Sequence, residues 1–112
     1  MLKYVVASII LFLIPLTASE FSNKDNEKAE YTLLHINAKW NKHNDLKFDR
    51  IKNCHIKYAL LEDQTKELQS QVHFVPHVVL FKKNKPVQQW QADLSFKLKL
   101  STEEVVEVIK SN

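Results

Sequence analysis

Glycine is absent from all 112 positions of this chain. The phosphate-binding loops of Walker and Rossmann proteins need glycine, because their backbone approaches the phosphate with no side chain in the way. The sequence therefore excludes nucleotide-dependent enzymes of those two classes.

A single cysteine, Cys54, limits how the fold can be held together. One cysteine forms neither an internal disulfide nor a cysteine-based zinc site. A chain of 112 residues has room for one small domain. The core must therefore be stabilised by packing alone.

Residues 1 to 19 have the pattern of a secretory signal peptide. Lys3 gives the positive end, an apolar run extends from Val5 to Leu16, and Thr17, Ala18 and Ser19 are small residues before a cleavage site. The apolar run is shorter than the roughly 20 residues that span a bilayer, so we expect cleavage after Ser19 and no stable membrane span afterwards. Export to a periplasm or a secretory lumen follows, and an uncleaved membrane anchor is the alternative.

The expected mature chain has little net charge. Without Lys3 it keeps 15 Lys and Arg against 13 Asp and Glu, a balance too mild to indicate nucleic acid. Residues 20 to 30 are polar and aperiodic, which predicts a flexible lead-in. The folded domain is predicted over residues 31 to 112.

Hydrophobic patterning in the first half predicts two strands, each followed by a helix. Tyr31–Asn37 is an apolar run typical of a central strand covered on both faces. Apolar residues within Asp45–Asn53 indicate a short helix of two turns, and alternation over Cys54–Leu61 indicates a second strand. Asp63 is expected to cap a helix that ends near Gln71.

The second half predicts a hairpin and a closing helix. Strands at Val78–Phe81 and Pro86–Gln91 are joined by a polar turn in which Asn84 tolerates a positive φ. Glu103–Lys110 has a helical apolar stripe after the capping box formed by Ser101 and Glu104. The alternating stretch Leu94–Leu100 predicts an extension of the sheet edge, with a strand that docks a partner as the alternative.

The order of these elements resembles the thioredoxin-like superfamily in its minimal form. The residues that carry the resemblance are Ile36-Asn37-Ala38-Lys39-Trp40, Val75-Pro76 before the strand Val78–Phe81, and the hairpin turn Lys82-Lys83-Asn84-Lys85-Pro86-Val87. It implies an α/β fold over residues 31 to 112, with a central mixed four-stranded sheet in the order βαβαββα flanked by helices.

The redox motif of that family is missing. By the resemblance, Asn41 and Asn44 stand where the two cysteines of Cys-x-x-Cys would be, and His35 stands where thioredoxins bury a carboxylate. Disulfide exchange requires a thiolate that attacks sulfur, and asparagine offers neither a thiolate nor a leaving group. The sequence thus predicts a redox-inactive member, with Cys54 in the core rather than reactive.

The Val75-Pro76 bond is expected to be cis by the same resemblance. A cis bond turns the chain sharply and would leave the N–H and C=O of Val75 free to pair with an extended peptide or protein segment, beside apolar walls. The residues of this peptide-binding candidate site are Trp40, Asn41, His43, Asn44, Phe74, Val75 and Pro76. The alternatives are that Pro76 is an architectural relic and that the chain is a purely structural subunit.

An enzyme is the rival hypothesis. It would use Cys54 as a thiol, or His43 and His77 in histidine-based chemistry. The five histidines match no zinc spacing, because the pair His73 and His77 contains Pro76 and is not helical. We therefore expect no metal and no cofactor, and the sequence leaves the oligomeric state open.

Overall fold

The computed structural model describes residues 29 to 112. The predicted signal peptide and the lead-in as far as residue 28 lie outside the described residues. Glu30, the last residue of the predicted lead-in, is already held by the domain. Its backbone N–H donates to Oδ1 of Asn53 at 3.0 Å, and its C=O accepts from the N–H of Lys83 at 2.9 Å.

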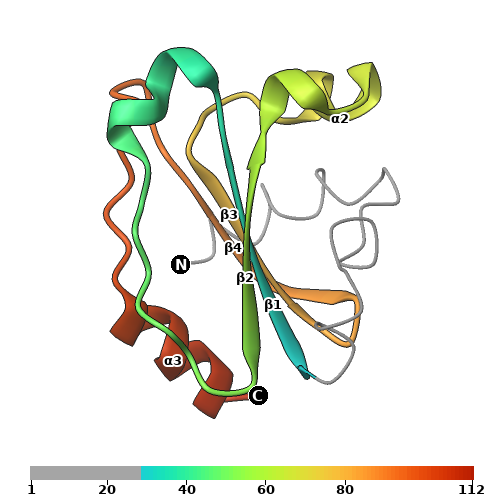
Figure 1. Ribbon diagram of the computed structural model, residues 1–112, viewed down its shortest axis with the longest axis vertical. Helices are drawn as coiled ribbons and strands as arrows, with labels where there is room; N and C mark the ends of the chain where they lie inside the picture. The colour runs from blue at the N-terminus through green and yellow to red at the C-terminus, as the bar shows by residue number, and fades with distance from the viewer. Residues whose placement is uncertain (1–28) are drawn as a thin grey trace.

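The centre of the domain is a four-stranded mixed sheet. Its strands are β1 (Tyr31–Asn37), β2 (Cys54–Leu60), β3 (His77–Lys82) and β4 (Lys85–Gln91). The order is β2-β1-β3-β4, with β1 parallel to β2 and antiparallel to β3, and β3 antiparallel to β4 (Figure 1). The structure thus confirms a small α/β domain with a mixed four-stranded sheet.

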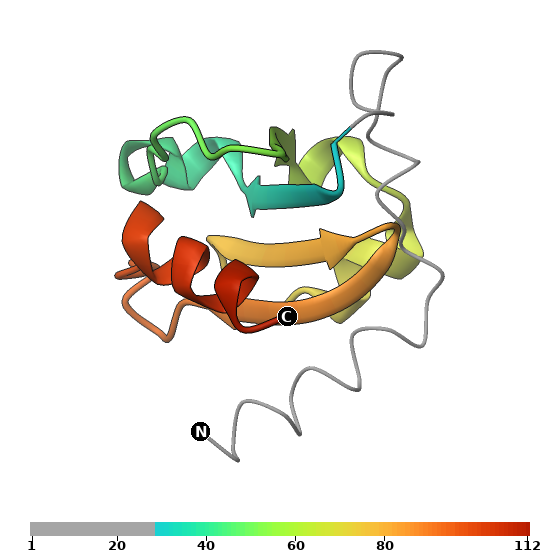
Figure 2. The same cartoon turned by 90° about the horizontal axis from the view of Figure 1, so that it is seen from below.

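Strand β1 organises the core, because all seven of its residues are buried. Alternate side chains of a strand point to opposite faces of the sheet. Leu34 and Ile36 contribute to one apolar cluster, which we call the α2 cluster because it includes Leu68 of the helix α2 (Lys66–Gln71). Leu33 contributes to a second, the α3 cluster, which includes Val105 of the helix α3 (Thr102–Lys110). The two helices lie on opposite sides of the sheet, as Figure 2 shows.

The two α-helices start at polar caps. Helix α3 (Thr102–Lys110) begins after Ser101, whose Oγ accepts from the N–H of Glu104 at 3.1 Å while the Glu104 carboxylate accepts from the N–H of Ser101 at 3.0 Å. This confirms the predicted capping box.

Helix α2 (Lys66–Gln71) is shorter than predicted, because Thr65 rather than Asp63 is its cap. Asp63 instead ends a 3-10 turn, η4 (Leu61–Asp63). Both residue types cap helices well, so composition alone did not decide between the two positions.

The helix predicted over Asp45–Asn53 is wrong, since residues 45 to 51 form no regular element. Helical turns lie earlier, in η3 (Lys39–Asn44). Side chains satisfy the backbone N–H groups that a helix would otherwise pair: the N–H of Leu46 donates to His35 Nε2 at 3.1 Å, and that of Asp49 donates to Thr102 Oγ1 at 2.9 Å. The apolar side chains at 46, 48 and 51 pack into the α3 cluster from this irregular segment.

The hairpin between β3 and β4 turns without glycine. Lys83 and Asn84 have φ values of 49° and 68°, and two adjacent residues at positive φ are what a tight type I′ turn requires. This confirms the positive φ predicted for Asn84.

Residues 94 to 100 form no strand, so the predicted extension of the sheet edge is wrong. Leu98 and Leu100 pack into the α3 cluster, while Phe96 packs into the α2 cluster. Apolar and polar residues alternate from Phe96 to Leu100 because every second side chain of this irregular segment is turned toward the core. Among residues 29 to 112, no helix combines the length and the apolar character needed to cross a membrane.

Removing the cap of α3 gives a direct test of its contribution. Ser101→Ala deletes the acceptor for the Glu104 N–H, and we expect it to lower the free energy of unfolding by about 1 kcal/mol. Ser70→Ala is the control, because the exposed Ser70 hydroxyl donates only to the Glu67 carbonyl within α2. Urea denaturation measures both variants, and an unchanged midpoint for Ser101→Ala would contradict the assignment.

Candidate functional site

Three segments far apart in the sequence meet beyond the carboxyl end of β1. They are the 3-10 helix η3, the bend at Val75 and Pro76, and the loop over residues 93 to 97. The Val75-Pro76 bond is cis. Most of the residues predicted for the peptide-binding site lie in the first two of these segments, and the third was not included in that prediction.

A buried network of asparagine side chains joins the three segments. We call Asn37, Asn41 and Asn44 the amide network. Asn41 Nδ2 is within hydrogen-bond distance of three acceptors: Asn37 Oδ1 at 3.0 Å, the Val75 carbonyl at 3.2 Å and the Phe96 carbonyl at 3.0 Å. An amide NH2 has two hydrogens, so one of them is shared between two acceptors. Asn41 is only 1% exposed.

Further hydrogen bonds join the members of the amide network to one another and to Asp45. Asn41 Oδ1 accepts from Asn44 Nδ2 at 2.8 Å, and the Asn41 carbonyl accepts from Asn37 Nδ2 at 2.9 Å. Asn37 Nδ2 also donates to Asp45 Oδ1 at 2.6 Å. A buried polar network of this kind stabilises the fold only when every member finds a partner, as these do.

This geometry changes the expectation for Val75. Its carbonyl, predicted to face a peptide partner, accepts a hydrogen bond from Asn41 inside the protein. The Val75 side chain is buried as well. The backbone N–H of Val75 donates to no group within residues 29 to 112, but the whole residue is only 3% exposed and offers little surface to a partner.

Aromatic side chains cover the amide network. We call Trp40, Phe74 and Phe96 the aromatic surface. The Trp40 ring meets Phe96 edge-on with centroids 4.9 Å apart, and Phe74 lies 6.3 Å from Phe96. The edge-to-face pair of Trp40 and Phe96 is stabilised beyond simple burial. Trp40 nevertheless remains 61% exposed.

Phe96 lies at the centre of the aromatic surface, on a strained backbone. Its φ of 58° places a bulky residue in the left-handed region, which costs about 1 to 2 kcal/mol for a residue with a Cβ. The hydrogen bond from Asn41 to its carbonyl and the contacts of its ring hold it there. Left-handed phenylalanine has no sequence signature, so the prediction missed this residue.

The helix η3 is anchored at both ends by acidic residues. The N–H of Lys39 donates to both carboxylate oxygens of Glu62, at 3.2 and 3.0 Å. At the other end, Asp45 contacts Asn37 and lies 3.7 Å from the Lys42 ammonium. These contacts fix the turn that presents Trp40.

A small cavity of about 170 Å³ lies beside the amide network. Its lining residues are His35, Asn37, Lys42, Asp45, Tyr58, Ala59 and Leu60. His35 Nε2 accepts from the N–H of Leu46, so the neutral ring carries its hydrogen on Nδ1. Burial lowers the pKa of His35, against the raising effect of the Asp45 charge.

The histidines proposed for an enzyme lie in different environments. His43 is exposed on η3, whereas His77 is 2% exposed in β3 and hydrogen-bonds Gln89 through Nε2. Burial lowers the pKa of His77 to about 4. Within residues 29 to 112, no three His, Cys, Asp or Glu side chains gather as metal ligands would.

Cys54 begins β2 and is half-buried. Its Sγ donates to the carbonyl of His55 at 3.8 Å. Burial raises the pKa of the Cys54 thiol to about 11. At neutral pH almost all of the thiol is therefore protonated, whereas nucleophilic chemistry needs the thiolate.

Comparison with known proteins adds no relative. No protein-family model matches the chain, and no curated protein is significantly similar to it. The residues and their geometry are thus the basis for a functional proposal.

Substituting Asn41 tests the amide network. Asn41→Ala removes the donor to the Val75 and Phe96 carbonyls, and we expect a loss of about 2 to 3 kcal/mol in the free energy of unfolding. Asn41→Asp keeps the shape and the acceptor for Asn44 but turns an oxygen toward those carbonyls, so it should cost at least as much. Urea denaturation at pH 7 measures both.

The matched control is Asn44→Ala. Asn44 is half-buried and donates one bond to Asn41, so we expect a loss of at most about 1 kcal/mol. Equal losses for Asn41→Ala and Asn44→Ala would contradict the central role of Asn41.

Burial of His77 predicts acid sensitivity. The ring has a pKa of 6.5 when unfolded and about 4 when folded, so the unfolded chain binds the proton first. Stability is therefore intact above pH 6.5 and falls between pH 6.5 and about 4, by roughly 3 kcal/mol from this group. His35, whose pKa is also lowered, adds to the fall in the same direction.

Urea denaturation as a function of pH measures this effect. His77→Gln should flatten the pH dependence below pH 6.5, whereas the exposed His73 replaced by Asn should leave it unchanged. An identical pH profile in His77→Gln and the parent chain would show that His77 is not the responsible group.

Proposed function

We propose that this chain is a redox-inactive member of the thioredoxin-like superfamily that binds extended peptide or protein segments. The finer fold assignment is supported by the strand order β2-β1-β3-β4, with a cis proline directly before β3. The first helix of the predicted βαβαββα order is replaced by η3 and an irregular segment.

The proposal of redox inactivity follows from the chemistry of the site. Asn41 and Asn44 occupy the positions that the resemblance assigns to the two cysteines, and their amides bond to each other at 2.8 Å. The only sulfur nucleophile, Cys54, begins β2, away from η3, and its thiol is protonated at neutral pH. Neither group supports thiol-disulfide exchange.

One observation carries the binding proposal: Trp40 is 61% exposed although its ring is held by Phe96. The structure describes three large apolar side chains as exposed, and two of them, Trp40 and Leu94, come from segments at this end of the sheet. Preorganised aromatic side chains are efficient binding anchors, since little side-chain entropy is lost on contact.

The proposed site of action is outside the cytoplasm, after removal of residues 1 to 19. The charge and hydropathy of that segment support export. The enzyme alternative finds less support. His77 is buried and hydrogen-bonded to Gln89, and the Cys54 thiol is protonated at neutral pH.

Peptide-array binding tests the proposal. We expect the protein to bind a subset of extended peptides that carry apolar side chains, and Trp40→Ala to weaken that binding about tenfold or more, because a central aromatic anchor contributes about 2 kcal/mol. Fluorescence anisotropy on selected peptides gives the affinities.

Tyr58→Ala is the matched control, since Tyr58 is 54% exposed on β2 and makes no contact in the aromatic surface of Trp40, Phe74 and Phe96. It should bind the same peptides with unchanged affinity. Peptide binding that survives Trp40→Ala, or its absence in the parent chain, would contradict the proposal.

A further inference from the structure

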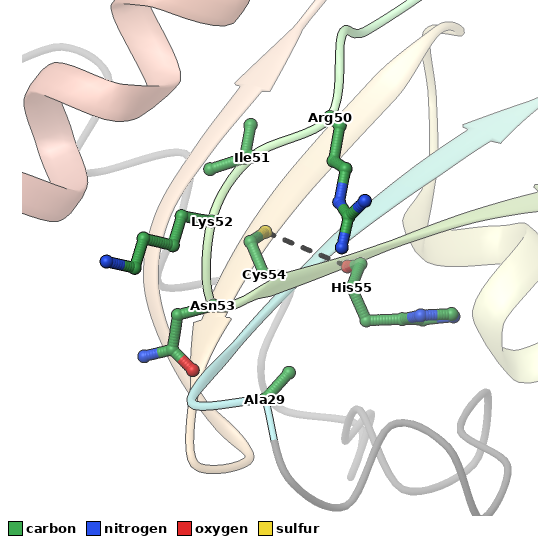
Figure 3. Close-up of a pocket in the computed structure, with 7 residues that line it drawn as sticks. All are labelled: Ala29, Arg50, Ile51, Lys52, Asn53, Cys54 and His55. Atoms are coloured by element: carbon green, nitrogen blue, oxygen red, sulfur yellow. Dashed lines mark hydrogen bonds between the residues drawn. The ribbon is translucent and has the colours of Figure 1, made fainter.

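A second and larger cavity lies at the opposite end of the sheet from the amide network. Strands β1 and β2 run parallel, so the start of β2 is far from Asn37 at the end of β1. The cavity has a volume of about 620 Å³, within the usual range for small-ligand sites. Its lining residues, drawn in Figure 3, are Ala29, Arg50, Ile51, Lys52, Asn53, Cys54 and His55.

The lining of this cavity is positively charged, because it contains Arg50 and Lys52 and no carboxylate. Figure 3 shows the guanidinium of Arg50 reaching over the Cys54–His55 segment, while Lys52 projects to the other side. Within residues 29 to 112, Arg50 forms no ion pair. Its planar fork of N–H donors is therefore available to an oxyanion from outside.

The neighbouring carboxylate does not neutralise Arg50. Glu30 follows the lining residue Ala29, but its oxygens are engaged elsewhere: Oε1 accepts from Asn53 Nδ2 at 3.2 Å, and Oε2 lies 3.8 Å from the Lys82 ammonium. Asn53 itself is held at a φ of 62°, which turns the chain into β2. The Glu30 carboxylate is thus engaged by Asn53 and Lys82 and not by Arg50.

The floor of the cavity is uncharged. Ile51 is 6% exposed, and the Cys54 thiol donates to the His55 carbonyl instead of facing Arg50 as a thiolate. The methyl group of Ala29 adds a further apolar element. An apolar floor below one free guanidinium fits a ligand with an apolar body and a single anionic group.

We propose that this cavity binds a small organic anion, with a carboxylate, phosphate or sulfonate on Arg50 and an apolar body over Ile51 and Cys54. The proposal is independent of the peptide-binding surface, because the two share no residue. It is carried by charge complementarity and by the shape of the cavity.

Octanoate is the probe. 1-Octanol has the same apolar chain without the anionic group, and inorganic phosphate is an anion without an apolar body. We expect octanoate to cause saturable shifts of the backbone amide signals of residues 51 to 55 in two-dimensional NMR of the whole chain. Arg50→Gln should weaken octanoate binding about tenfold, the usual effect of losing one charge-assisted hydrogen-bond pair. Lys47→Gln, an exposed charge on the same segment outside the cavity, should leave it unchanged.

Each other outcome overturns a stated part of the proposal. Equal binding of 1-octanol would remove the need for an anion, and equal binding of inorganic phosphate would remove the need for an apolar body. Shifts confined to the surroundings of Trp40 would assign the ligand to the aromatic surface instead. Unchanged octanoate affinity in Arg50→Gln would overturn the site itself.

Discussion

The side chain of Asn41 is the interaction on which the rest of this end of the molecule depends. One buried amide holds the end of β1, the bend before β3 and the loop after β4 through Asn37, Val75 and Phe96. Buried carbonyls without a donor would be costly, so the segments stay together only while that amide is present. The exposed ring of Trp40 and the half-buried rings of Phe74 and Phe96 therefore lie at a rigid polar base.

Under the proposed relationship to thioredoxin-like proteins, this polar base replaces the reactive cysteine pair. The positions that would carry a reactive sulfur pair carry instead a donor and an acceptor bound to each other and to the backbone. Such an arrangement favours fixed geometry over reactivity. The site is then suited to recognition, with Trp40 as the group that a partner would contact first.

The sequence predicted the elements whose signal is local and strong. The mainly apolar run of β1 and the reciprocal Ser101 and Glu104 cap were found because each needs only its own neighbours. The segment after η3 was mistaken for a helix, because His35 and Thr102, distant in sequence, accept its backbone N–H groups. Tertiary contacts of this kind override a weak helical period.

The candidate site shows the same division between local and distant information. Trp40 and Pro76 could be selected from their motifs, and the cis bond before Pro76 was expected from the resemblance to thioredoxin-like proteins. The acceptors of Asn41 could not be predicted, because one of them belongs to Phe96, 55 positions later in the chain. An unusual φ at a phenylalanine leaves no trace in composition or spacing.

Within residues 29 to 112, four residues adopt left-handed backbone without being glycine: Asn53, Lys83, Asn84 and Phe96. Replacing Lys83 by glycine would relieve the backbone strain of the turn and remove few contacts. This substitution would therefore raise the free energy of unfolding. Phe96 is different, because glycine there would relieve the same strain while deleting the ring that supports Trp40. Phenylalanine at position 96 therefore lowers the stability of the fold through its backbone strain, while its ring supports the exposed side chain of Trp40.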